Sequence, residues 1–112
     1  MTSKSRTTTK KVQKEDLLPL ITPGEFLEEE FLEPLGLSMN ALSIALRVPQ
    51  TRILGIVRSG RAITADTALR LGQYFGMEPE FWMNLQSNYE LKKAKREKLA
   101  QIQVEVQRRP AA

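Results

Sequence analysis

Apolar residues recur at helical spacing from about residue 22 onward, and no strand is needed to explain their pattern. The first amphipathic stretch predicts a helix from about Pro23 to Glu33, with Thr22 placed to cap it. Pro34 and Gly36 are expected to stop this helix. Its apolar side is formed by residues four apart in the sequence: Leu27, Phe31 and Leu35.

Two shorter amphipathic segments follow, separated by a break at Val48 and Pro49. The first begins after Ser38, a good N-cap, and ends near Arg47. The second ends at Ser59 and Gly60, as helices commonly do. The apolar stripe of the first is Met39, Leu42 and Leu46, and that of the second is Ile53, Ile56 and Val57.

A fourth helix is predicted after Thr64, as its N-cap, and ends at Gly76, while a fifth opens at Pro79. The side of the fourth helix that is expected to face inward carries Ala68, Leu71, Gly72 and Phe75. One side of the fifth carries Phe81, Trp82, Leu85 and Tyr89, which we expect in the core or at a dimer interface rather than at a stacking site for bases. Five helices joined by short loops predict an all-α domain over residues 22–91.

The two ends of the chain differ from this domain. Residues 1–21 form a basic arm that begins MTSKSRTTTKKVQKED, which has too few apolar side chains to bury and is expected to be disordered. Residues 92–112 form a charged extension that could contact a partner or a second copy. Within it, the spacing over residues 99–107 fits a helix and a strand equally well.

Composition excludes several classes of function. The chain has 112 residues, a net charge of +4, no Cys and no His, so it offers neither a thiolate nor an imidazole for catalysis or zinc binding. We expect no enzyme activity, no metal and no cofactor. The absence of a long apolar segment predicts no membrane span, and no signal peptide is apparent, so a cytoplasmic location is expected.

The sign of the charge changes along the chain in a way that marks one segment. Residues 23–46 carry five Glu and no basic residue, whereas residues 47–61 carry four Arg and no acidic residue. The arginine segment therefore predicts an anionic partner. Its members are Arg47, Arg52, Arg58 and Arg61.

Residues 38–60 have the signature of a helix-turn-helix, with two short helices and a second helix whose beginning is polar. Gln50, Thr51 and Arg52 are placed to read base edges in the major groove of double-stranded DNA. The remaining basic residues are better placed for phosphates, which fix register without reading sequence. The predicted phosphate contacts are Arg47, Arg58, Arg61 and Thr64.

Three motifs together resemble one family. PGEFLEEEFLEPLGLS, GRAITADTALRL and PEFWMNLQ, in this order within about residues 21–91, resemble the HigA antitoxins of the phage-repressor-like (XRE) helix-turn-helix group. The resemblance implies a five-helix DNA-binding domain, a homodimer formed largely through its C-terminal helices, and a repressor that binds an inverted-repeat operator of its own operon. It also implies neutralisation of a HigB toxin, a RelE-like mRNA endonuclease.

The sequence departs from the family pattern at two positions of the turn. Arg47 stands where relatives usually have Gly, and Pro49 stands where they usually have a capping residue such as Ser. A positive φ at Arg47 would cost on the order of 1 kcal/mol. Two alternative functions stay open: a solitary repressor without a toxin, and a toxin-binding module without specific DNA binding.

The acidic cluster of the first helix has two interpretations. Its carboxylates could be a solvated helix face, or they could attract a basic toxin by opposite charge. The possible toxin contacts are Glu25, Glu28 and Glu29.

Overall fold

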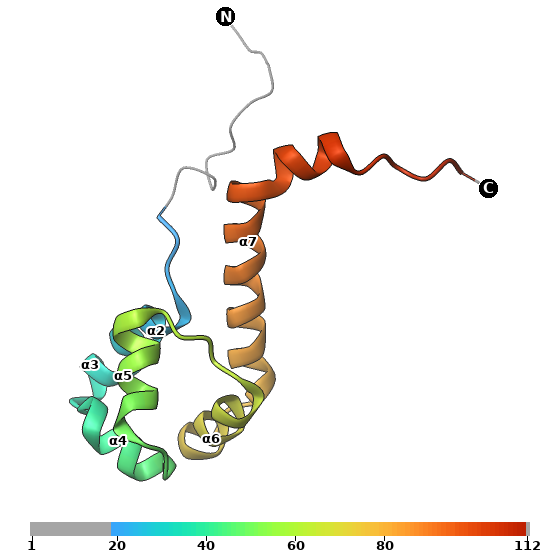
Figure 1. The fold of residues 1–112 in the computed structure, drawn as a ribbon. Helices are drawn as coiled ribbons and strands as arrows, with labels where there is room; N and C mark the ends of the chain where they lie inside the picture. The colour runs from blue at the N-terminus through green and yellow to red at the C-terminus, as the bar shows by residue number, and fades with distance from the viewer. Residues whose placement is uncertain (1–18, 112) are drawn as a thin grey trace, which may run out of the picture.

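The computed structural model describes residues 19–111, and every regular element within them is helical (Figure 1). A continuous helical segment comes first and consists of α2 (Pro23–Leu27), the π-helical turn η1 (Glu28–Leu32) and α3 (Glu33–Leu35). The four remaining helices are α4 (Met39–Leu46), α5 (Gln50–Ser59), α6 (Ala65–Phe75) and α7 (Pro79–Glu105). The prediction of a five-helix, all-α fold is confirmed. Most of the predicted N-terminal arm, residues 1–18, lies outside the described residues.

A single apolar core joins these helices. α2 packs on α5 and α7, α4 packs on α5 and α6, and α6 packs on α7. Trp82 is fully buried and lies among the rings of Phe26, Phe31 and Phe81. The other buried apolar side chains are Leu27, Leu32, Leu42, Leu46, Ile53, Ile56, Val57, Ile63, Ala68 and Leu71.

The first helical segment differs from its prediction because it contains a π-helical turn. The N–H of Glu33 donates to the carbonyl of Glu28, five residues back, so the helix widens and continues through Pro34. Gly36, at φ 62°, ends it instead. The extra residue shifts the inward face by one position, so Leu32 is buried and Leu35 is 61% exposed. The prediction that Leu35 faces inward was therefore wrong.

The next three helices match their predicted bounds closely. Ser38 Oγ accepts a hydrogen bond from the N–H of Ala41 at 3.0 Å and caps α4. Thr64 occupies the N-cap position of α6, but its side chain makes no hydrogen bond to the helix backbone, and its hydroxyl lies 3.4 Å from that of Thr67. The prediction that its side chain caps the helix was wrong in that respect.

Helix α7 is longer than the core requires. It runs for 27 residues, passes the predicted boundary at residue 91 without a break, and includes residues 99–105, where the sequence left helix and strand open. In Figure 1 its last turns bend away from the domain, and the C-terminal residues extend further still. No helix among residues 19–111 is long and apolar enough to cross a membrane.

Candidate nucleic-acid interface

The turn between α4 and α5 is closed by backbone hydrogen bonds around a left-handed residue. The N–H of Arg47 donates to the carbonyl of Ile44 at 3.1 Å, and the N–H of Val48 donates to that of Ser43 at 3.0 Å. This arrangement needs a positive φ at the residue after the helix, and Arg47 adopts φ 60°. Arg47 is the one residue other than glycine in residues 19–111 with a positive φ.

The beginning of α5 is exposed and polar. Pro49 is the N-cap residue, with φ −60° and ψ 145°, and its carbonyl accepts from the N–H of Arg52 at 3.0 Å. Its ring offers no side-chain cap. Gln50 and Thr51 are both exposed, so their side chains are accessible to a partner at the N-terminal end of the helix. The opposite face of α5 buries Ile53, Ile56 and Val57 as predicted.

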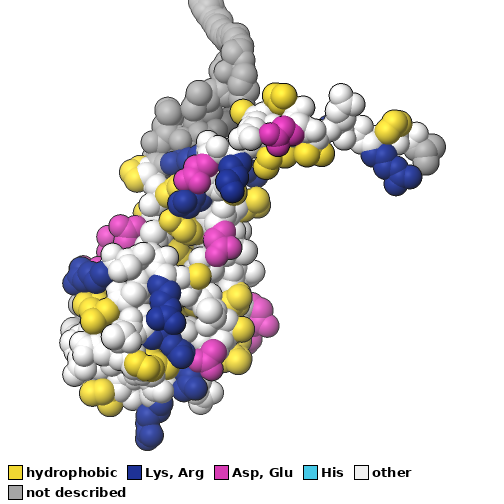
Figure 2. Space-filling view, viewed as in Figure 1, with side chains coloured by type: hydrophobic (Ala, Val, Ile, Leu, Met, Phe, Trp, Pro, Cys, Tyr) yellow, Lys and Arg dark blue, Asp and Glu magenta, His cyan; other side chains and the backbone are white. Residues whose placement is uncertain are grey.

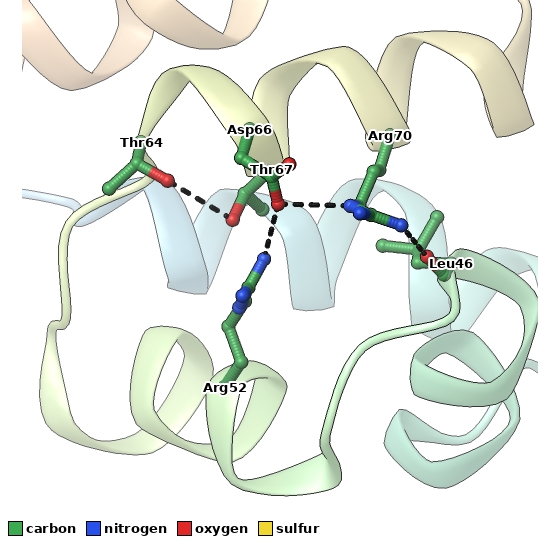
Figure 3. A network of polar contacts seen from close by, with 6 residues as sticks. All are labelled: Leu46, Arg52, Thr64, Asp66, Thr67 and Arg70. Carbon is green, nitrogen blue, oxygen red and sulfur yellow. Dashed lines mark hydrogen bonds and ion pairs between the residues drawn. The ribbon is translucent and has the colours of Figure 1, made fainter.

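A polar network ties this end of α5 to α6 and α4 (Figure 3). Asp66 Oδ2 accepts hydrogen bonds from Arg52 Nη1 at 2.6 Å and from Arg70 Nε at 2.9 Å. Arg70 Nη1 also donates to the carbonyl of Leu46, the last residue of α4, at 2.9 Å. Hydrogen bonds from Arg70 and Arg52 hold the pKa of the Asp66 carboxyl below its usual value. Asp66 on α6 is therefore paired directly with α5 and is linked through Arg70 to the end of α4.

Two further arginines, Arg58 and Arg61, lie at the far end of α5 and just beyond it. Arg58 Nη2 lies 3.5 Å from Glu28 Oε2 and forms an exposed ion pair. The Arg61 side chain lies against Gly55, where an added Cβ would come within 3.1 Å of its Cδ. Arg47, Arg58 and Arg61 are exposed. Figure 2 shows Lys and Arg side chains in a column on the face where α5 lies.

The predicted aromatic residues of α7 fall into two groups. Trp82 is in the core, and Leu85 packs against it from a half-buried position. Phe81 is 38% exposed although its ring packs on Phe26 and Trp82, while Tyr89 is half-buried.

The acidic residues of the first helical segment have unequal access to a partner. Glu25 Oε1 accepts from the N–H of Thr22 at 2.9 Å, and Thr22 Oγ1 accepts from the N–H of Glu25 at 3.0 Å, so Glu25 belongs to a capping box. Glu28 pairs with Arg58. Glu29 is exposed. No group of three or more acidic residues among residues 19–111 is arranged to hold a metal ion.

Sequence analysis missed three residues that shape this region. Asp66 and Arg70 stand four apart on a predicted helix with opposite charges, which was a usable signal for an ion pair. Gln86 had no such signal, because its Oε1 accepts from the N–H of Ile63, 23 residues away, at 2.8 Å. That hydrogen bond attaches the loop before α6 to α7.

The fold and the α4–turn–α5 unit define a helix-turn-helix protein of the phage-repressor type. No protein-family model matches the chain. The chain is 54% identical over 81 residues to virulence-associated protein I of Dichelobacter nodosus, which covers 72% of this chain and 75% of that protein. It is 37% identical over 71 residues to antitoxin HigA-1 of Vibrio cholerae serotype O1, which covers 63% of this chain and 67% of that protein.

A solved structure agrees with these relatives. The Pseudomonas aeruginosa antitoxin HigA with the higBA promoter matches with a TM-score of 0.76 at 45% identity, covering 80% of this chain and 97% of that chain. The chain therefore belongs to the HigA family of antitoxins, as the sequence motifs predicted. Two of these three relatives are antitoxins, and other matches are helix-turn-helix transcriptional regulators, so this is a family of regulators and not of enzymes.

Proposed function

We propose that this protein is an autorepressing antitoxin that binds an inverted-repeat operator as a dimer and neutralises a HigB-type toxin. The observation that carries the DNA-binding part is the exposed polar start of α5, which follows a turn closed by backbone hydrogen bonds and precedes exposed arginines. The relative of known structure that was solved with promoter DNA supports the same interpretation.

In this proposal the residues divide between reading and positioning. Gln50 and Thr51 contact base edges in the major groove, and Arg52 contacts a base from the same turn. The phosphate contacts are Arg47, Arg58, Arg61 and Thr64, which fix the register of the helix. Two α5 helices related by a two-fold axis would lie about 34 Å apart and read successive major grooves.

Dimerisation through α7 is the second part of the proposal. Beyond residue 91, this helix leaves the domain and keeps apolar side chains exposed, among them Leu99 at 39% and Ile102 at 44%. Such side chains are costly to leave in water and are covered when two copies associate. The exposed parts of Phe81, Leu85 and Tyr89 would extend the same interface.

Toxin binding is assigned to the acidic start of the domain. Basic toxins are attracted by the five carboxylates of residues 23–46, and Glu29 is more available than Glu25 or Glu28, which have partners inside the chain. A charge reversal, Glu29→Lys, should reduce co-purification with the product of the neighbouring toxin gene. Glu80→Lys, the same charge reversal at an exposed glutamate on α7, should not.

The DNA-binding proposal is tested by fluorescence anisotropy on the DNA upstream of the gene and on shuffled DNA, over a salt series. Gln50→Ala should lose about 1–3 kcal/mol of discrimination at one base pair, whereas Gln73→Ala, an exposed glutamine outside the α4–turn–α5 unit, should behave as wild type. Arg61→Ala should weaken binding to both DNAs and lower the salt slope by about one. Equal, weak binding of wild type to both DNAs would overturn the operator-binding proposal.

A further inference from the structure

The N-terminal turn of α5 contains one arginine that is already engaged within the protein. Arg52 reaches from α5 across to α6, where its Nη1 donates to Asp66 Oδ2 at 2.6 Å (Figure 3). Its side chain is 28% exposed, compared with 59% for Arg58 at the other end of the same helix. Arg52 is therefore held in one orientation, whereas Arg58 is largely surrounded by solvent.

The geometry of the ion pair leaves part of the guanidinium group available. An arginine has five N–H donors in a rigid planar fork. Among the described residues, the contact with Asp66 uses one of the two terminal nitrogens of Arg52. The other nitrogens can donate to a base edge or a phosphate while the contact with Asp66 is kept.

Asp66 is itself held in place. Arg70, one turn later on α6, donates to the same Oδ2 atom and anchors its own Nη1 on the carbonyl of Leu46. A carboxylate with two arginine donors cannot follow Arg52 if that side chain moves away. It also repels phosphate, because both groups are negatively charged, so it disfavours a backbone contact by the arginine next to it.

From these contacts we propose that Asp66 is a specificity-determining positioning residue for operator recognition. It holds the Arg52 guanidinium toward a base and disfavours its binding to phosphates of DNA of any sequence. Asp66 need not touch DNA to act in this way. The inference rests on the proposed function, since it assumes that the start of α5 faces the major groove.

The test compares operator and shuffled DNA by anisotropy with full-length wild type, Asp66→Asn, Arg52→Ala and the double variant. A well-oriented contact from an arginine to a base favours the correct base over a wrong one by about 1–3 kcal/mol. Asp66→Asn should therefore lower the operator-to-shuffled affinity ratio by about tenfold. Binding to shuffled DNA should stay equal or become tighter. In the Arg52→Ala background, Asp66→Asn should change the ratio no further.

Two controls separate this role from a structural one. Glu30→Gln removes the same charge from an exposed carboxylate of η1, outside both the α4–turn–α5 unit and α7, and should leave the ratio unchanged. Arg70→Gln removes the second donor to Asp66 and the anchor to Leu46 but leaves Asp66 paired with Arg52, so it should lower stability and should lower the ratio less than Asp66→Asn does.

The outcomes distinguish this inference from the proposed function. Wild type that does not discriminate operator from shuffled DNA contradicts the proposed function itself. Two results would overturn the positioning role of Asp66 and leave the proposed function intact, provided that wild type discriminates. One is an unchanged operator-to-shuffled affinity ratio in Asp66→Asn, and the other is an equal loss of that ratio when Asp66→Asn is added to Arg52→Ala.

Discussion

The N–H of Ile63 donates a hydrogen bond to Oε1 of Gln86 at 2.8 Å inside the domain. Ile63 is 1% exposed and Gln86 is 7% exposed, so water cannot replace either partner. The amide of Gln86 also donates through Nε2 to Glu90 Oε2 at 2.8 Å, which fixes its orientation. This one side chain holds the loop that leads from the recognition helix α5 into α6.

Gln86→Leu should destabilise the protein by about 1–3 kcal/mol, because the buried N–H of Ile63 would have no acceptor. Urea unfolding followed by circular dichroism measures this directly. Gln86→Glu keeps an acceptor for Ile63 but sets a second carboxylate beside Glu90, so it should also destabilise the protein by like-charge repulsion, and adding Glu90→Gln should recover most of that loss. No recovery in the double variant would contradict this account of the Glu90 contact.

Gly24 lies where α2 crosses α5 and has no room for a side chain. An added Cβ would lie 1.9 Å from the carbonyl oxygen of Ile56, which is backbone and cannot rotate away. Gly24→Ala should therefore separate the two helices and cost about 1–3 kcal/mol or more.

The matched control is Gly55→Ala. There the Cβ would meet only the flexible Arg61 side chain, and a helical alanine is favoured over glycine by about 1 kcal/mol. The thermal midpoint should therefore fall for Gly24→Ala and rise slightly for Gly55→Ala. Similar losses in both variants would show that the backbone contact at Ile56 is not the cause.

Asp66 should make the stability of the domain depend on pH in acid. Its pKa lies below the ordinary value of 3.8 because Arg70 and Arg52 donate hydrogen bonds to it. A lowered pKa in the folded state means that the ion pairs stabilise the fold above pH 3.8 and are lost as the pH falls through the folded-state pKa. The difference in urea midpoint between wild type and Asp66→Asn should be present at pH 7. It should disappear as the pH falls below the folded-state pKa of Asp66. A constant difference down to acid pH would contradict this linkage.

The sequence predicted most of the fold because helix caps and apolar spacing are local signals. Ser38 and Gly60 lie at helix ends as predicted, and the stripe of Ile53, Ile56 and Val57 is buried. The first helical segment was harder to predict. A π-helical turn is not encoded by the apolar period, so Leu32 was missed and Leu35 was placed on the wrong side.

The candidate site was predictable in position but not in detail. The arginine segment and the polar start of α5 could be read from residue types alone. The ion pair between Arg52 and Asp66 joins residues 14 apart on two helices, and it depends on how α5 and α6 pack. Side-chain contacts of this kind depend on how the helices pack, and the spacing of apolar residues in the sequence does not predict that packing.

Arg47 combines backbone strain with a proposed phosphate contact, and two substitutions separate these roles. Arg47→Ala and Arg47→Gly remove the same charge, so both should weaken binding to operator and shuffled DNA alike and lower the salt slope by about one. Only glycine relieves the positive φ of 60°, so Arg47→Gly should be the more stable variant by about 1 kcal/mol in urea unfolding. Equal stability of the two variants would mean that the turn relaxes around alanine, and unchanged DNA binding in both would remove Arg47 from the interface.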